Sequence, residues 1–335
     1  MLPKERVSIA LNLSQPDKVP KGELVITDGF VKSMLGKSVI TLEDRAHTLQ
    51  ILGQDLVCLH YALQKDGQAG YSRVNGKGGG EVLGTWFSEN PELIVPTRKD
   101  FMLKDIAWWT GHTDFFVFVV IDSVFGLGVS KIGFMDFVSL IVTEPEKVTP
   151  FVEGVTSLVL ELAIEAKRLG AHGIILADDI AFDEGTFLSL EGIRRFLFPL
   201  WRKIIDEVTK MGIKILFHSD GKIVEAIPMI IEAGFSGLHS LQPSAGMDIA
   251  LVKREYGRDL CLMGNIDLSL IGNRGLSNTI PSEALIEIRT TVQKTMQLAA
   301  PEGGFIFGSC GGLMEGLPIV NVMEMYRCAE EFGNY

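Results

Sequence analysis

The 335-residue sequence lacks any long apolar run. Its longest strongly apolar stretch, residues 115–121, is far shorter than the roughly 20 residues that a membrane-spanning helix needs. The first 20 residues mix apolar positions with polar residues and prolines, a pattern that does not resemble a signal peptide. We therefore expect a cytoplasmic protein with no membrane partner.

Positive charge is also scarce. The chain has 31 Lys and Arg against 42 Asp and Glu, a formal net charge of −11 at pH 7, which disfavours nucleic acid and anionic lipid as partners. No block of like charge suggests a tail, and 47% of the residues are hydrophobic. The sequence predicts one globular domain over residues 1–335.

The sequence contains neither a CxxC cysteine pair nor a GxGxxG glycine motif. Cys58, Cys261, Cys310 and Cys328 form no CxxC pair, so neither a disulfide framework nor a zinc ribbon is indicated. The densest glycine run, NGKGGG at 75–80, does not match GxGxxG and predicts a mobile loop. A doubly wound nucleotide-binding sheet is therefore only our second choice of architecture.

The sequence does contain short apolar runs of strand length, whose continuous apolarity predicts strands buried on both faces. They occupy residues 56–61, 115–122, 173–179, 214–220, 237–242, 260–267 and 304–310. An eighth strand is expected near 23–27.

Amphipathic stretches of helical length lie between several of these runs, at 148–169, 190–211, 222–233, 282–299 and 318–332. Gly170, Gly212 and Gly234 stand where helix C-caps are expected. Alternating strands and helices predict a parallel sheet. Because polar residues end most of the strands, we predict a single (β/α)8 TIM barrel of the α/β class, with its site at that end.

The run at 214–220 ends in His218, Ser219 and Asp220. Strand residues two apart face the same way, so His218 and Asp220 are expected to converge while Ser219 turns away. They could bind a metal, with Cys310 of the glycine-flanked GSCGG as third ligand, or form an acid/base pair. A hydrogen-bonded rim histidine beside a helix-capping aspartate is the structural alternative.

Other polar residues at strand ends are candidates for the same site. Asp178 and Asp179 are adjacent, so only one should face the pocket, where it could hold a substrate group, act as a base or merely cap a loop. Asp122, His239 and Asn265 are weaker candidates for substrate binding.

Four stretches resemble the uroporphyrinogen decarboxylase superfamily. They read PKERVSIALNLSQPDKVP, LADDIAFDEGTFLSLEGIRRFLFP, FHSDGKIVEAIPMIIEAGFSGLHSLQPSAGMDIALVKREYGRDLCLMGNID and GGFIFGSCGGLMEGLPIVNVMEMY. The resemblance is strongest after residue 170 and implies a (β/α)8 barrel. It also implies one of two chemistries: cofactor-free decarboxylation of a tetrapyrrole, or corrinoid-linked methyl transfer with a barrel-bound zinc.

The decarboxylases of this superfamily resemble one another in an RQAGR run, whose arginines meet substrate carboxylates. The corresponding region here reads VITDGFVKSMLG and places Asp28 where a polyanionic substrate would need positive charge. The resemblance therefore favours the methyltransferase branch, with Asp28 as a candidate for binding a different substrate.

Thiol-methylating members of that branch resemble one another in a His-x-Cys pair and a distant Cys. His218 and Cys310 match two of these positions, and Asp220 replaces the middle Cys. Carboxylate is an acceptable zinc ligand and makes zinc a harder Lewis acid, suited to an ether oxygen or an amine.

The resemblance then implies a zinc-dependent methyltransferase. It would demethylate a small O-methyl or N-methyl substrate and pass the methyl group to cob(I)alamin, the reduced cobalamin on a partner corrinoid protein. Asp122 with Asp178 or Asp179 would position the donor.

Two alternatives stay open. One is a metal-free decarboxylase acting on a carboxylated substrate, with His218 and Asp220 as acid and base. The other is a binding protein that keeps the fold and only docks a corrinoid protein or a small ligand. The sequence does not name the methyl donor, and it allows a homodimer without requiring one.

Overall fold

The structure, a computed structural model, describes residues 1–63, 93–98, 101–102, 105–272 and 281–335. The glycine-rich loop predicted at 75–80 lies outside these residues. Internal contacts divide the chain into two compact units. The first comprises Met1–Cys58, Trp108–Val117 and Ser236–Tyr335, and the second comprises Leu59–Ala107 and Phe118–Phe235.

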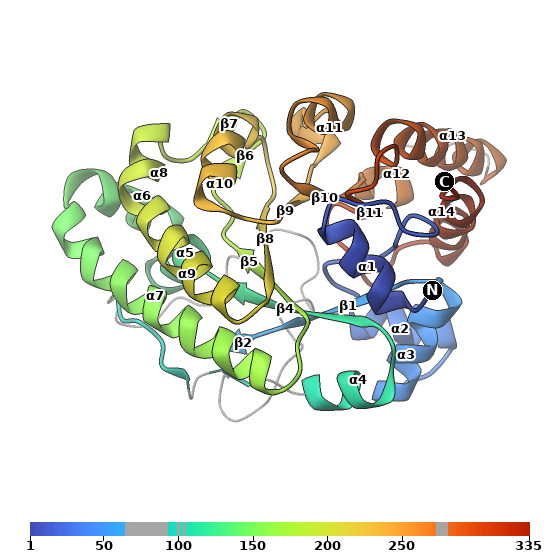
Figure 1. Cartoon of the computed structure of the whole chain (residues 1–335), viewed down its shortest axis with the longest axis horizontal. Helices are drawn as coiled ribbons and strands as arrows, with labels where there is room; N and C mark the ends of the chain where they lie inside the picture. Colours follow the sequence, from blue (N-terminus) through green and yellow to red (C-terminus); the bar gives the residue numbers. More distant parts are fainter. Residues whose placement is uncertain (64–92, 99–100, 103–104, 273–280) are drawn as a thin grey trace. The chain divides into compact units, whose positions relative to one another are not determined.

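Parallel strands form the centre of the second unit, in the order β4–β5–β8, with β1 beside β4 (Figure 1). Val120 of β4 pairs with Ile175 of β5, and Ile175 pairs in turn with Leu216 of β8. All three side chains are buried. The strands are β1 Leu56–His60 and β4 Phe116–Asp122, which both begin in the first unit, and β5 Gly173–Ala177 and β8 Lys214–Ser219.

Helices and two short antiparallel strand pairs complete this unit. The helices are α5 Val124–Ile132, α6 Phe134–Thr143, α7 Pro145–Arg168, α8 Leu190–Phe196, α9 Phe198–Lys210, the 3₁₀ turn η3 Val224–Ala226 and α10 Ile227–Ala233. One antiparallel pair joins β2 Ala62–Leu63 to β3 Phe101–Met102, and the other is the hairpin of β6 Ala181–Phe182 and β7 Gly185–Thr186.

One predicted helix is in fact two. The stretch 190–211 breaks between α8 and α9 at Leu197, and Pro199 stands in the first turn of α9. Proline has no N–H to donate and is tolerated in the first turn of a helix, so the chain ends one helix and begins another there.

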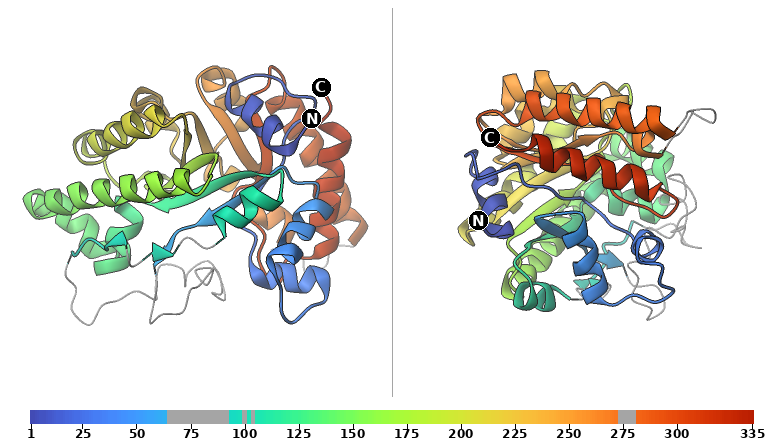
Figure 2. Two further views of the ribbon diagram at one scale, coloured as in Figure 1. Left: turned by 60° about the horizontal axis from the view of Figure 1, so that its bottom comes forward. Right: turned by 90° about the vertical axis from the view of Figure 1, so that its right-hand side faces the viewer.

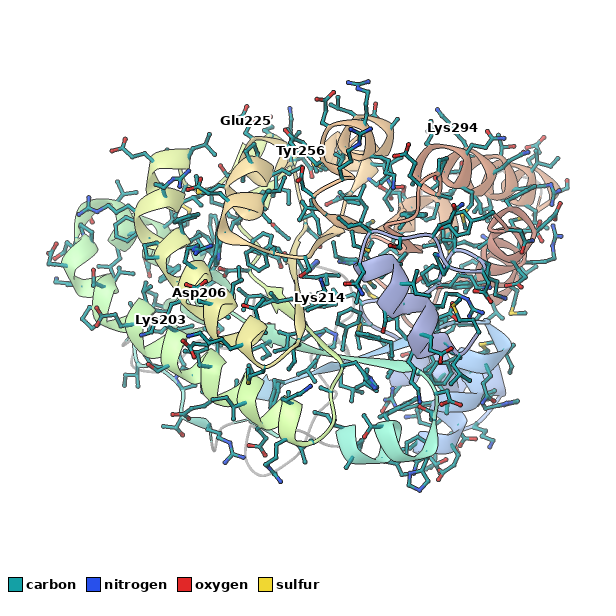
Figure 3. All side chains as sticks on the ribbon, in the orientation of Figure 1. Lys203, Asp206, Lys214, Glu225, Tyr256 and Lys294 are labelled. Carbon is teal, nitrogen blue, oxygen red and sulfur yellow. The ribbon has the colours of Figure 1, made fainter. Side chains whose placement is uncertain are left out.

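Helix α9 packs on β8 through aromatic side chains. The Trp201 ring lies 5.0 Å from Phe217 and 5.9 Å from Phe235, centroid to centroid, and all three rings are buried. Lys203 and Asp206 lie on the outer face of the same helix and are exposed (Figure 3). The apolar face of α9 therefore holds the strand whose end carries His218.

The first unit contains three more parallel strands, in the order β9–β10–β11, where Leu262 of β10 lies between Leu238 of β9 and Phe305 of β11. Helices α13 and α14 run side by side (Figure 2). The strands are β9 Gly237–Ser240, β10 Cys261–Ile266 and β11 Phe305–Ser309. The helices are α1 Pro3–Leu11, α2 Asp28–Leu35, α3 Leu42–Ile51, η4 Pro243–Ala245, α11 Ile249–Tyr256, α12 Leu268–Gly272, α13 Pro281–Ala299 and α14 Ile319–Phe332, while α4 Ile106–His112 begins in the second unit.

The eighth strand expected near 23–27 is an extended segment beside β11. Among the described residues two isolated parallel bridges connect it to β11 and the chain just after it, Lys21 with Phe307 and Ile26 with Leu313. Between these bridges the N–H of Ser309 donates to the Glu23 side chain and not to a main-chain carbonyl. This side-chain acceptor explains why the ladder is interrupted.

The described residues thus confirm an α/β fold with parallel strands, and all seven predicted strands are present. Gly170, Gly212 and Gly234 have φ of 100°, 70° and 100° at helix ends, as predicted for C-caps. No single helix among the described residues is both long enough and apolar enough to cross a membrane. Helices α5 and α6 meet both criteria only when they are taken together, and the chain bends by 113° between them.

Candidate active site

Three side chains of the second unit come together where β5 and β8 end. The carboxylate oxygens of Asp179 and Asp220 and a ring nitrogen of His218 lie within 4.8 Å of one another. This cluster, Asp179, His218 and Asp220, is the candidate active site.

Strand register explains how the three residues meet. Ala177 at the end of β5 is the partner of His218 on β8, and Asp179 follows Ala177 by two positions, as Asp220 follows His218. Residues two apart on a strand face the same way. Two main-chain donors hold the strand ends together: Asp220 N donates to Asp179 Oδ1 at 3.0 Å, and Asp178 N donates to the His218 carbonyl at 3.0 Å.

The members of the cluster differ in exposure. The His218 side chain is 7% exposed, whereas that of Asp179 is 56% exposed, and His218 Nε2 lies 3.7 Å from Asp179 Oδ1. Asp220 is also exposed. The imidazole is therefore held in the protein while both carboxylates face solvent, so a ligand can reach them.

Ser219 turns away from the cluster. Its hydroxyl accepts from Ile180 N at 3.1 Å and donates to the Asp220 carbonyl at 2.7 Å. These bonds connect the chain after β5 to the end of β8. Gly221, with φ +82°, passes so close to the β6 backbone that a Cβ there would lie 2.6 Å from the Ala181 carbonyl carbon.

The donor set of the cluster fits a zinc ion. One imidazole nitrogen and two carboxylate oxygens are ligands that zinc accepts, and catalytic zinc sites have three protein ligands and one open position. The same geometry without metal would be an acid/base pair, in which Asp179 Oδ1 lies 3.7 Å from His218 Nε2.

Asp178 faces a different environment from Asp179. It is fully buried, and its Oδ1 accepts from Phe125 N, in the first turn of α5, at 2.6 Å. Burial raises the pKa of Asp178 to about 7, while the hydrogen bond from Phe125 N lowers it. The structure thus places one of the adjacent aspartates in the core and the other in the cluster.

Asp122 lies at the same edge of the sheet. It ends β4, is the register partner of Ala177 and is half-buried. Because Ala177 is in turn the partner of His218, Asp122 and His218 are aligned across three strand ends. Asp122 therefore lies on the same face of the sheet as the cluster and could contact a substrate bound by Asp179 or Asp220. Its role in substrate binding stays a prediction.

The remaining predicted site residues belong to the first unit. His239 is buried on β9, and Asn265 on β10 donates from Nδ2 to the Leu241 carbonyl at 3.3 Å. Cys310 is buried just after β11, and Asp28 opens α2 in an ion pair with Arg45. The cluster of the second unit contains none of them, so their roles stay predictions.

Sequence reasoning missed Glu23, a buried carboxyl of the first unit. It accepts from Ser309 N at 3.1 Å and from Ser309 Oγ at 2.5 Å, and Tyr326 Oη also donates to it. Burial raises the pKa of Glu23 to about 7, against these hydrogen bonds, which lower it. The only signal in the sequence is an acidic residue at the start of the apolar stretch ELVI.

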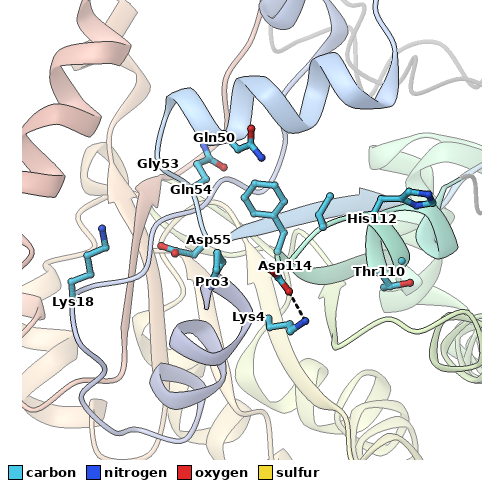
Figure 4. A pocket seen from close by; sticks show the side chains of 13 residues that line it. Pro3, Lys4, Lys18, Gln50, Gly53, Gln54, Asp55, Thr110, His112 and Asp114 are labelled. Atoms are coloured by element: carbon cyan, nitrogen blue, oxygen red, sulfur yellow. Dashed lines mark hydrogen bonds and ion pairs between the residues drawn. The ribbon is translucent and has the colours of Figure 1, made fainter. Parts of the chain in front are cut away.

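A pocket of about 770 Å³ lies elsewhere in the first unit (Figure 4). Asp55 and Phe115, which line it, directly precede β1 and β4, so it lies at the amino ends of these strands. Its Lys4 is paired with Asp114 at 2.7 Å. We assign it no catalytic role, since ligands of parallel α/β sheets bind at the carboxyl ends of the strands.

Residues 117–332 match the uroporphyrinogen decarboxylase (URO-D) family. The chain belongs to this family. The matched region of this URO-D protein includes the whole cluster, Asp179, His218 and Asp220, and also Cys310.

Known relatives of this URO-D protein include methyltransferases. It is 23% identical over 189 residues to a methylated-thiol–coenzyme M methyltransferase of Methanosarcina mazei, covering 56% of this chain and 46% of the relative. The chain therefore spans about half the length of that curated relative.

Two solved structures share the fold. A methyltransferase from Methanosarcina mazei matches with a TM-score of 0.69 at 16% identity over 99% of each chain. A B12-independent methionine synthase from Shewanella sp. W3-18-1 matches with a TM-score of 0.52 at 11% identity over 95% of each chain. At such identities the matches establish the fold alone.

Proposed function

We propose that this URO-D family protein is a zinc-dependent methyltransferase. It demethylates a small O-methyl or N-methyl compound and passes the methyl group to cob(I)alamin on a partner corrinoid protein. The methylated-thiol–coenzyme M methyltransferase to which the chain is similar supports the reaction class. We also propose that the fold is the closed (β/α)8 barrel predicted from the sequence.

The observation that carries the proposal is the cluster of Asp179, His218 and Asp220. Zinc held there would act as a Lewis acid on the heteroatom that carries the methyl group. His218, being almost buried, fixes the position of the site, and the two exposed carboxylates balance the charge of a divalent cation. Cys310 as a further ligand stays a prediction from the sequence.

The donor set also favours a class of substrate. Two carboxylate oxygens are harder ligands than the thiolates of a thiol-methylating site, so oxygen or nitrogen is the heteroatom that we expect. During transfer the bond from this atom to the methyl carbon breaks and its electron pair stays on the heteroatom. Cob(I)alamin on the partner protein would supply the electron pair for the new bond to carbon. Asp122, at the end of β4, would accept a hydrogen bond from an N–H or O–H group of the methyl donor.

Decarboxylation of a carboxylated substrate is not favoured. Asp122, Asp179 and Asp220 gather at the strand ends that would have to receive the substrate carboxylate. Like charges at short range oppose its binding.

The proposal is tested by anaerobic incubation of zinc-loaded protein with free cob(I)alamin and a panel of methoxyarenes and methylamines. Formation of methylcobalamin is followed by its absorbance. We expect transfer from at least one donor. His218→Ala should lower the rate about 100-fold or more, since losing even a group that only orients a metal ligand costs about 10–100-fold.

Asp183→Asn is the matched control. Asp183 is an exposed carboxylate in the turn of the β6–β7 hairpin and is not a member of the cluster. This variant should keep the wild-type rate. Absence of transfer from every donor, or equal rates for His218→Ala and Asp183→Asn, would refute the proposed function.

A further inference from the structure

Glu23 is a buried carboxyl that the proposed chemistry does not use. It is 2% exposed, and its hydrogen-bond partners among the described residues are Ser309 and Tyr326, neither of which carries a compensating positive charge. Burying a carboxylate without an ion-pair partner opposes folding. A residue that costs stability at its position requires another explanation.

The partners of Glu23 indicate what this residue does. Both of its oxygens contact Ser309: Oε1 accepts from the main-chain N at 3.1 Å, and Oε2 accepts from Oγ at 2.5 Å. The same Ser309 hydroxyl accepts from Gly312 N at 2.7 Å. Glu23 thus holds one hydroxyl that in turn closes the turn Ser309–Gly312.

Cys310 lies inside this turn. Its own N–H donates to the Ile266 carbonyl at 2.9 Å, so main-chain donors on both sides of the thiol are fixed. The turn also packs tightly on the segment that follows Glu23, because a Cβ at Gly312 would lie 2.4 Å from the Val25 side chain and 2.5 Å from its carbonyl oxygen. Little freedom remains for the backbone that carries the thiol.

Tyr326 also donates to this carboxylate, at the oxygen that accepts from Ser309 N. Its hydroxyl donates to Glu23 Oε1 and accepts from Gln54 Nε2 at 3.1 Å. This chain of hydrogen bonds fixes the Glu23 side chain but does not contact the turn. Tyr326 therefore offers a variant that perturbs the same carboxylate without touching Ser309.

We propose that Glu23 is a positioning residue, which clamps the turn Ser309–Gly312 and so fixes the direction of the Cys310 thiol. The inference rests on the proposed function in one respect: it gives Cys310 a part in methyl transfer. It adds a residue from the opposite end of the sequence to the surroundings of Cys310, and this residue acts through Ser309 without binding substrate or metal itself.

The test measures the reactivity of Cys310 in metal-free protein. Wild type, Glu23→Gln and Tyr326→Phe are treated with iodoacetamide, and labelling of the Cys310 peptide is followed by mass spectrometry over time and pH. Glu23→Gln should raise the labelling rate about fivefold or more, since it weakens two hydrogen bonds of the clamp. Tyr326→Phe should stay within about twofold of wild type, because the Ser309 contacts remain.

Ser309→Ala provides a second test that leaves Glu23 in place. Removing this hydroxyl breaks the bonds to both Glu23 and Gly312, so it should accelerate labelling as Glu23→Gln does. Circular dichroism and thermal melting check that each variant is folded. Unchanged labelling in Glu23→Gln and Ser309→Ala, or an equal increase in Tyr326→Phe, would overturn the inference.

Labelling of metal-free protein does not depend on methyl transfer. A wild type that transfers no methyl group refutes the proposed function and leaves the comparison of labelling rates intact. Conversely, an active enzyme with unchanged labelling in Glu23→Gln refutes only the positioning role.

Discussion

At the scale of single residues, Asp178 makes stability depend on pH. Its pKa is raised from 3.8 to about 7 because the folded protein buries it. Folding then favours the protonated form, so its contribution to stability is fully present below pH 4 and is lost as the pH rises through 7. The neighbouring Asp179 is exposed and does not share this burial.

Asp178→Asn should remove this pH dependence, since the amide stays neutral and its oxygen can still accept from Phe125 N. Relative to wild type, the melting temperature of metal-free Asp178→Asn should rise between pH 5 and pH 8. The comparison is made by calorimetry at both pH values, with Asp183→Asn as control. A constant difference between Asp178→Asn and wild type would contradict the burial of a titrating carboxyl.

The sequence predicted which site residues meet only where they lie on one strand, because side chains two residues apart on a strand face the same way. His218 and Asp220 were expected to converge because they are two apart in a strand, and the structure does bring them together. Asp179 as a partner of His218 Nε2 depends on the β5–β8 register, and Glu23 contacts a residue 286 positions away. Neither contact can be predicted from the residues that neighbour it in the sequence.

At the scale of secondary-structure elements, Trp201 anchors α9 on β8. Trp201→Ala should lower the free energy of unfolding by about 3–5 kcal/mol, the usual cost of truncating a buried aromatic residue. Trp201→Phe should cost less than about 1.5 kcal/mol, because the ring contacts largely remain. The buried Trp201 Nε1 also has no hydrogen-bond partner among the described residues.

These values are measured by chemical denaturation. Lys203→Ala, on the exposed face of the same helix, should stay within about 0.5 kcal/mol of wild type. If Trp201→Ala is as mild as Lys203→Ala, α9 does not pack on β8 as described.

A second prediction at this scale concerns Gly221, which follows β8 and lies close to the β6 backbone. Gly221→Ala should reduce both stability and zinc affinity, because its Cβ would push Ala181 away and disturb the chain between Asp179 and β8. Gly212→Ala is the matched control: φ is +70° but nothing lies within 4 Å, so it should cost only the left-handed strain of about 1–2 kcal/mol. Chemical denaturation and zinc competition distinguish the two variants, and equal losses in both would contradict the contact.

Elements were predictable where their pattern is simple. Continuous apolar runs marked all seven strands, and glycine marked three helix ends. The break between α8 and α9 was missed because the amphipathic pattern continues across Leu197. The extended segment near Glu23 was expected as a strand, but a side-chain acceptor replaces a ladder hydrogen bond there.

At the scale of the whole molecule, membership of the URO-D family agrees with the resemblance seen in the sequence, and the α/β fold agrees with its alternating pattern. The single domain over residues 1–335, the cytoplasmic location and the homodimer stay predictions. What the family does not decide is the chemistry, which depends on whether Asp179, His218 and Asp220 hold a metal.

Zinc content tests that claim most directly. Protein purified without oxygen and reconstituted with zinc is analysed for metal per chain, together with His218→Ala, the double variant Asp179→Asn/Asp220→Asn and the control Asp183→Asn. The account predicts about one zinc per chain in wild type and control, and loss of zinc in both cluster variants. Metal-free wild type after reconstitution, or full zinc content in His218→Ala, would contradict it.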